Sequence, residues 1–137
     1  MRKLPIPFLV ALFFLVSCKK ENKTCDLNAS NITGSYKVTA YTYQPDASSP
    51  PEDFLATTET CKRDDVLTFN DNGTTTHTDA GVKCFPSQDD TGAWSLNGDV
   101  LTVDGDALTI STFNCSTMVL TQTGLPGETI NVTFIRQ

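Results

Sequence analysis

The sequence predicts an all-β domain, an up-and-down antiparallel barrel of about eight strands, with a β-sandwich as the alternative. Apolar and polar residues alternate with a period of two from Ile32 onward. Turn dipeptides, most clearly Asn97-Gly98 and Asp104-Gly105, separate the alternating segments by short links. Helical periodicity is nearly absent, although 50–58 (PPEDFLATT) allows one short turn of helix. The β domain is therefore expected to span 32–137.

The N-terminal segment has the features of a bacterial lipoprotein signal peptide. Arg2 and Lys3 precede an apolar run over 4–16, which is shorter than the roughly 20 residues of a membrane-spanning helix. Ser17 and Cys18 then complete a match to the lipobox, in which the cysteine thiol is acylated and the chain is cut before it. We expect 1–17 to be removed and Cys18 to carry acyl chains such as palmitate. The alternatives are an ordinary signal peptide with a chance cysteine, or a short membrane anchor.

Residues 18–31 are polar and are expected to form the lipidated N-terminus and a flexible tether. Removal of 1–17 leaves eight basic and sixteen acidic residues, a net charge of −8. That charge argues against nucleic acid as a partner and against electrostatic binding to anionic lipid. Membrane contact is therefore expected through the acyl chains, at the outer membrane, with periplasmic or surface exposure left open.

Eight segments have the composition and the alternation of strands. In the first of them the alternation places Tyr36, Val38 and Ala40 on one face and Lys37, Thr39 and Tyr41 on the other. Later segments also place their apolar residues mostly on one face. We therefore expect one face of the sheet to be buried and the other to be exposed to solvent. The expected strands are 34–43, 66–70, 73–79, 93–96, 99–103, 106–113, 117–123 and 128–137.

Four cysteines remain once Cys18 is acylated, and outside the cytoplasm an even number indicates disulfides. Four cysteines allow three connectivities. The preferred pairing is Cys61 with Cys84, which leaves Cys25 with Cys115. No C-x2-C spacing occurs and the chain has one histidine, so a zinc site is not expected.

Several motifs in this order resemble the lipocalin-like lipoproteins of Bacteroidetes-type bacteria, over about 31–137. They are Gly34-Ser35-Tyr36, Cys61-Lys62-Arg63-Asp64-Asp65 before VLTF, Asn72-Gly73, Gly92-Ala93-Trp94 and a last strand ending in Arg136. The resemblance implies a lipocalin-like barrel in which Arg136 packs across Tyr36, which stands where lipocalins have tryptophan. It also implies a small apolar ligand, without naming one.

Candidate catalytic residues are few, so we expect that the protein is not an enzyme and that it needs no cofactor. His77 is alone in a Thr-rich strand and is expected to be exposed. Asp64-Asp65 and Asp89-Asp90 would point to opposite faces in strands, which favours solvated loop or edge charges. No G-x-S-x-G or S-x-x-K motif and no calcium-binding loop occurs.

Two functional classes stay open. A ligand carrier would have Tyr41, Tyr43 and Phe54, with Trp94, around a binding mouth near the long loop 44–60. Alternatively Trp94 and Tyr36 are core residues, the other tyrosines lie on the surface, and the domain is a structural or protein-interaction module of unknown partner. A pocket of several hundred cubic ångströms would favour the carrier. A barrel filled by Trp94, Met118 and Phe134 would favour the interaction module.

Overall fold

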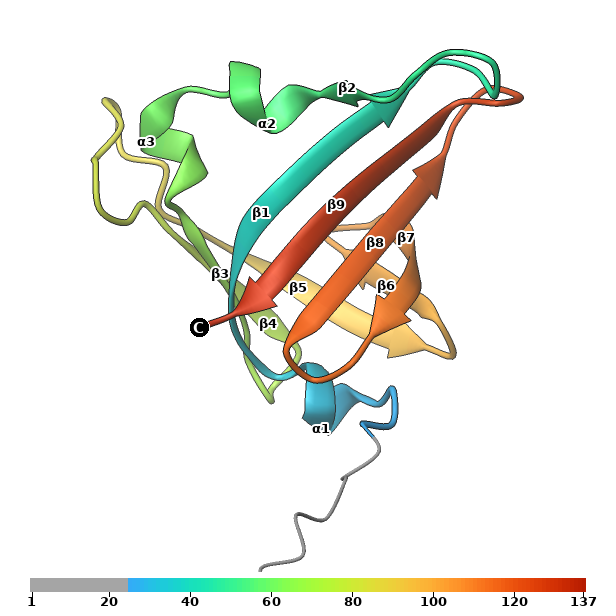
Figure 1. The fold of residues 1–137 in the computed structure, drawn as a ribbon. Coiled ribbons are helices and arrows are strands. Elements are labelled where there is room, and N and C mark those ends of the chain that lie inside the picture. The colour runs from blue at the N-terminus through green and yellow to red at the C-terminus, as the bar shows by residue number, and fades with distance from the viewer. Residues whose placement is uncertain (1–24) are drawn as a thin grey trace, which may run out of the picture.

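The computed structural model describes residues 25–137 and has nine antiparallel strands in one sheet (Figure 1). The strands are β1 (Gly34–Gln44), β2 (Glu52–Asp53), β3 (Val66–Phe69), β4 (Thr74–Thr78), β5 (Asp90–Asn97), β6 (Val100–Val103), β7 (Asp106–Phe113), β8 (Thr117–Thr123) and β9 (Thr129–Arg136). The helices are α1 (Ala29–Ile32), α2 (Phe54–Thr57) and α3 (Thr60–Arg63). The signal peptide and Cys18 lie outside the described residues.

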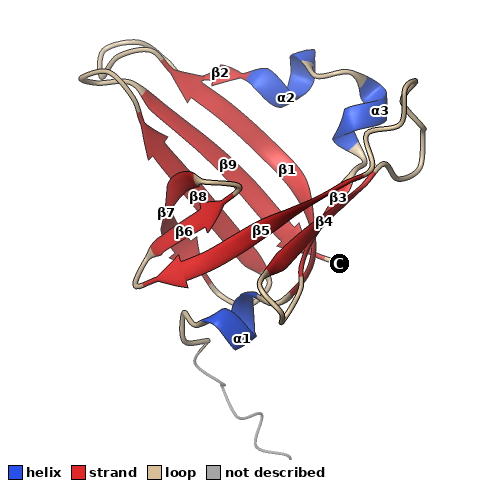
Figure 2. Cartoon of the chain, turned by 180° about the vertical axis from the view of Figure 1, so that it is seen from behind, coloured by secondary structure: helices blue, strands red, loops and turns tan. Residues whose placement is uncertain are grey.

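The sheet closes into a ring because β1 pairs with β9 as well as with β3. The all-β, up-and-down expectation is confirmed, with β2 as one strand more than the sequence indicated. Because consecutive strands are antiparallel, their connections alternate between the two ends of the barrel. The closed end holds α1 and the turns around 70–73, 98–99 and 114–116 (Figure 2). The open end holds 45–65, with α2 and α3, and the loops 79–89 and 124–128.

The pairing register identifies the inner face of the barrel. Residues paired across a ladder share a face, so Tyr36, Leu67 and His77 lie on one face in neighbouring strands. The same rule joins Phe134 to Met118 on β9 and β8. The buried hydrophobic core occupies this face in the half near α1: Ile32, Tyr36, Phe69, Trp94, Leu101, Ile110, Met118, Leu120 and Phe134.

A β-bulge at Thr39 changes the expected orientation of the second half of β1. The register with β9 shifts between Val38 and Ala40, so the extra residue reverses the alternation. Tyr41 therefore pairs with Val132 on the inner face, whereas the sequence alternation placed it outside. The assignment of Ala40 to the inner face was wrong for the same reason, because regular alternation cannot register an inserted residue.

Three local expectations differ from the structure. Part of the segment 18–31, expected to be a flexible tether, is structured, because Cys25 is disulfide-bonded and Ala29–Ile32 form α1, which buries Ile32. The helical turn expected within 50–58 is α2. The second short helix, α3, was not expected from the sequence. The turn at Asn97-Gly98 has Gly98 and Asp99 at its centre, with positive φ at Gly98, as in a type II′ turn. At the next hairpin, Asp104 and Gly105 both have positive φ, as type I′ requires.

None of the helices within 25–137 is both long enough and apolar enough to cross a membrane.

Candidate functional site

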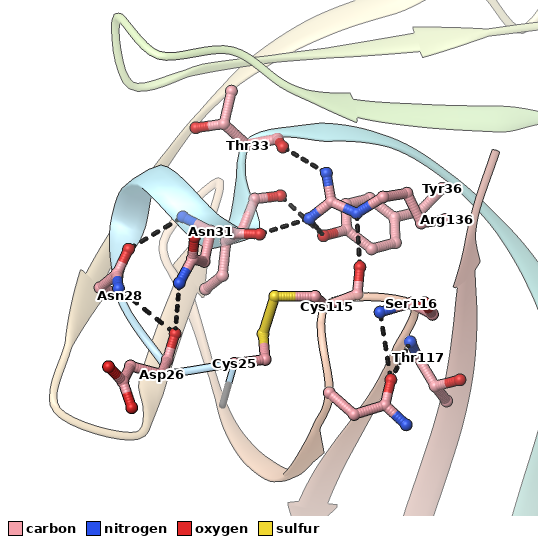
Figure 3. Close-up of a disulfide and its surroundings, with 12 residues drawn as sticks. Cys25, Asp26, Asn28, Asn31, Thr33, Tyr36, Cys115, Ser116, Thr117 and Arg136 are labelled. Carbon is pink, nitrogen blue, oxygen red and sulfur yellow. Dashed lines mark hydrogen bonds between the residues drawn. A yellow bond between two sulfur atoms is a disulfide. The ribbon is translucent and has the colours of Figure 1, made fainter. Parts of the chain in front are cut away.

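The closed end of the barrel is organised around Arg136 and Tyr36, which the structure brings together (Figure 3). The guanidinium carbon lies 4.9 Å from the ring centroid of Tyr36, and Nη2 donates to the phenol oxygen at 2.5 Å. The phenol in turn donates to the carbonyl of Ile32 at 2.8 Å. Burial raises the pKa of Tyr36, and the positive charge of Arg136 opposes that shift. The pair is a structural closure, because its polar atoms are already bonded within the protein.

The remaining donors of Arg136 tie two separate segments, the one before β1 and the β7–β8 turn, to the last strand (Figure 3). Nε donates to the carbonyl of Cys115 at 2.6 Å and Nη1 to that of Thr33 at 2.6 Å, while Nη2 also bonds the carbonyl of Asn31. Gly34 makes room for this network, because its φ is +141° and a Cβ there would overlap the guanidinium. The family resemblance implied the contact with Tyr36, and carbonyls at the barrel end were the expected acceptors of the other N–H groups, but the sequence did not identify which carbonyls they are.

The disulfide between Cys25 and Cys115 fixes α1 beside this network. The side chain of Asn28 caps α1 by accepting from the N–H of Asn31 at 2.9 Å. Cys115 has φ of +65°, a left-handed conformation that costs free energy in a non-glycine residue and that these contacts hold in place. The expected pairing of Cys25 with Cys115 and of Cys61 with Cys84 is confirmed.

Trp94 belongs to the core of the closed half. Its ring packs edge-on against Phe69, with centroids 5.4 Å apart, and Phe69 packs the same way against Tyr36 at 5.7 Å. The indole N–H donates to the carbonyl of Asn70 at 2.9 Å, so its polar atom is satisfied inside the protein. The placement of Trp94 at a binding mouth was therefore wrong.

The open end brings the other three predicted aromatic residues together. Phe54, from α2, stacks on Tyr43 with centroids 5.2 Å apart and packs edge-on against Tyr41 at 5.6 Å. A hydrogen bond to the carboxylate of Glu128 raises the pKa of Tyr43. Burial of the phenol and the negative charges of Glu128 and Glu52 raise it further. These three rings, which we call the mouth aromatics, form one wall of the open end.

The inner face at the open end is apolar but only half-buried. Tyr43 pairs with Ile130, which faces Gln122 on β8, and Leu108 occupies the same face of β7. In contrast to the buried core, these side chains remain partly accessible to solvent. The half-buried apolar positions are Tyr41, Tyr43, Leu67, Val103, Leu108, Ile130 and Val132. These half-buried apolar residues, together with Phe54, are the candidate ligand site.

A separate hollow of about 190 Å³ is lined by Ala93, Trp94, Ser95, Thr102 and Gly105. Ala93 and Ser95 alternate with the inward-facing Trp94, so the hollow lies on the outer side of β5 and β6. Its volume is below the roughly 300 Å³ at which ligand pockets begin. We therefore do not assign the ligand to it.

Carboxylates organise the loop 79–89 at the open end. Asp79 is fully buried and accepts from the N–H groups of Cys84 and Gln88 at 3.1 and 3.2 Å. Asp65 accepts from Ala80, Asp64 from Val82, and Asp89 from the N–H of Asp79. Because the loop has no strand partner, side-chain oxygens replace the missing backbone acceptors. The expectation that Asp65 is a solvated charge was wrong, since only 9% of the residue is exposed.

His77 is part of the same arrangement and is not the exposed residue that the sequence predicted. Its Nδ1 lies 2.8 Å from the carbonyl oxygen of Gln88, and its Nε2 lies 3.2 Å from Oδ2 of Asp65. Both neighbours are distant in sequence from His77, so alternation within β4 could not reveal them. Across 25–137, no cluster of three or more His, Cys, Asp or Glu residues is placed to hold a metal ion.

The closed antiparallel barrel agrees with the comparison with known families. A family model described as a lipocalin-like domain matches residues 32–120. The chain belongs to the lipocalin-like domain family. No curated protein matches the sequence. The lipocalin-like match extends from the last residue of α1 into β8 and so includes the Tyr36 strand, while Ile130, Val132 and Arg136 lie beyond its end.

Proposed function

We propose that this lipocalin-like domain binds a small apolar ligand at the half-buried apolar residues of its open end and has no catalytic role. The observation that carries the proposal is the contrast between the two halves of the inner face. The fully buried core lies in the closed half, whereas Ile130 at the open end stays partly exposed beside the mouth aromatics, and neither it nor those rings belong to the core cluster or pack against it. Partly accessible apolar and aromatic side chains are typical of ligand sites.

The charges at the rim indicate which ligands fit best. Glu128 lies beside Tyr43, and Asp106 and Asp90 share the inner face at the open ends of β7 and β5. Clefts lined by one sign of charge exclude ligands of the same sign. An uncharged apolar molecule is therefore the better probe, and an anionic one of equal size is expected to bind about tenfold more weakly at low salt.

Titration of residues 25–137 with an uncharged solvatochromic dye tests the proposal. Leu108→Glu would place a charge at the candidate ligand site and is expected to weaken dye binding at least tenfold, because a buried unpaired carboxylate is costly. Thr109→Glu is the matched control: Thr109 is the next residue on β7, is exposed, and faces outward. Equal affinities of the two variants, or no dye binding by the unmodified domain, would contradict the proposal.

We propose further that the domain is held at the outer membrane by acyl chains on Cys18, after removal of 1–17, with the face of the membrane undecided. The supporting observation is the lipobox sequence before Cys18. Cys25 is fixed at the closed end, so the tether would join the barrel at the end opposite the candidate ligand site. An anchored barrel would then keep its open end accessible.

A protein-interaction role is the second candidate. Phe85 is fully exposed and Val82, in the same loop, is 56% exposed. Exposed aromatic residues in ordered loops are frequent anchors of protein interfaces. If this role is correct, the dye titration above would fail while Phe85→Ser would abolish the binding of the partner.

A further inference from the structure

The loop 79–89 is tied to the segment before β3 by the Cys61–Cys84 disulfide and by Asp64, which accepts from Val82, and one further side chain bridges the loop and the barrel wall. His77 is on β4, Gln88 lies at the end of the loop, and Asp65 immediately precedes β3. The imidazole ring stands between them, with Nδ1 2.8 Å from the Gln88 carbonyl and Nε2 3.2 Å from the Asp65 carboxylate. Asp65 also accepts from the N–H of Ala80 at 3.2 Å, so it bonds the beginning of the same loop. His77 and Asp65 therefore hold both ends of the loop.

The two contacts of the ring require a particular number of protons. A carbonyl oxygen only accepts hydrogen bonds, and so does an ionised carboxylate. A neutral imidazole has one N–H and can donate to one of these partners. If that N–H is on Nδ1, the lone pair of Nε2 faces the oxygen of Asp65. Both contacts of the ring become hydrogen bonds when one more proton lies between Nε2 and Asp65. That proton is bonded either to Nε2 or to the carboxylate oxygen.

We propose that His77 and Asp65 form a proton-dependent clasp that holds the two ends of the loop 79–89 against the barrel when the extra proton is present and loosens them when the proton is lost, while the Cys61–Cys84 disulfide keeps the middle of the loop attached. Acid therefore closes the loop and base loosens it. The charged groups around the ring are Asp65 before β3, Asp90 opposite His77 on β5, and Asp89 and Lys83 in the loop. The clasp does not depend on the proposed ligand.

Hydrogen exchange of residues 25–137, read by NMR between about pH 5 and about pH 8.5, tests the clasp across the range in which histidine changes charge. The sequence has a single histidine, so the imidazole titration is assigned without ambiguity. We expect the protection factors of Ala80 and Val82, corrected for intrinsic exchange, to fall about tenfold with the midpoint of the imidazole titration, because one charge-assisted bond is lost. Leu125 is the internal control, because its N–H donates to Glu128 at the same end, away from His77.

Two variants separate the clasp from a general effect of pH. Asp65→Asn should invert the dependence: the loop stays protected at high pH, because the amide N–H can donate to a neutral Nε2 while its oxygen still accepts from Ala80, and it loses protection in acid, where Nε2–H faces the amide N–H. His77→Phe should leave the loop weakly protected at every pH. Protection that stays constant while His77 titrates would overturn the proposal. An Asp65→Asn loop that loosens with rising pH, as the unmodified loop does, would also overturn it. This second comparison does not require that His77→Phe folds.

Discussion

Arg136 lies directly opposite Tyr36 in the pairing of β9 with β1, and its guanidinium bonds the Tyr36 phenol and three backbone carbonyls. The three carbonyls belong to the segment before β1 and to the β7–β8 turn, two parts of the chain that no strand ladder connects. One side chain near the C-terminus thus joins the first strand, α1 and the Cys115 turn at the closed end.

Arg136→Ala should lower the melting temperature of 25–137 by at least about 5 °C. Its loss leaves several carbonyls without a donor, which we expect to destabilise the domain by about 2 kcal/mol. Calorimetry measures the change. Lys37→Ala is the control, since Lys37 is next to Tyr36 but on the outer face, and dye binding at the open end should be unchanged. If the variant has the same melting temperature as the unmodified protein, the contacts of Arg136 contribute no stability.

The two disulfides should contribute unequally to the free energy of unfolding. They close loops of 90 and 23 residues, for which the chain-entropy relation gives about 4.5 and about 3.5 kcal/mol. Urea unfolding of Cys25→Ser/Cys115→Ser and Cys61→Ser/Cys84→Ser measures the difference. The first double variant should also expose α1 to exchange, and the second should loosen loop 79–89. The reverse order of stabilities would show that native contacts outweigh the loop entropy.

Replacement of Cys18 by serine should abolish acylation of the full-length chain. Growth of the expressing cells with an alkynyl fatty acid, followed by click labelling, detects the acyl group. Cys18→Ser should give uncut or soluble protein without label, whereas Cys61→Ser, which leaves the lipobox intact, should retain it. Equal labelling of the Cys18 variant and the unmodified chain would rule out the lipobox.

The loop 45–49 should keep its order in acid, down to about pH 2. Hydrogen bonds from Ser48 and Ser49 lower the pKa of Asp46 to about 2. A lowered pKa means that the contribution of the ionised carboxylate is complete above the usual value near 4 and is lost as the pH falls through about 2. The carboxyl carbon shift of Asp46 should report this midpoint. In Asp46→Asn the N–H groups of Ser48 and Ser49 should exchange faster at neutral pH, and a midpoint near 4 in the unmodified protein would contradict the loop geometry.

The alternation of apolar residues and the turn dipeptides determined most of the fold. Period-two segments identified every strand except the two-residue β2, because such a short segment has no measurable period. Asp104-Gly105 located its turn because only a few residue types tolerate positive φ at both central positions. The cysteine count restricted the disulfides to three connectivities, and the preferred one is present.

Only the tertiary structure decided the sites. The bulge at Thr39 turned Tyr41 and Tyr43 inward to meet Phe54, and an inserted residue is invisible to a periodic pattern. His77 was brought between Asp65 and Gln88 by strand pairing and loop closure, which are contacts between residues distant in sequence. Local sequence determines which backbone conformation a segment prefers and which face is apolar. Where a polar side chain finds its partners depends on the closure of the whole sheet, because those partners come from other strands and loops.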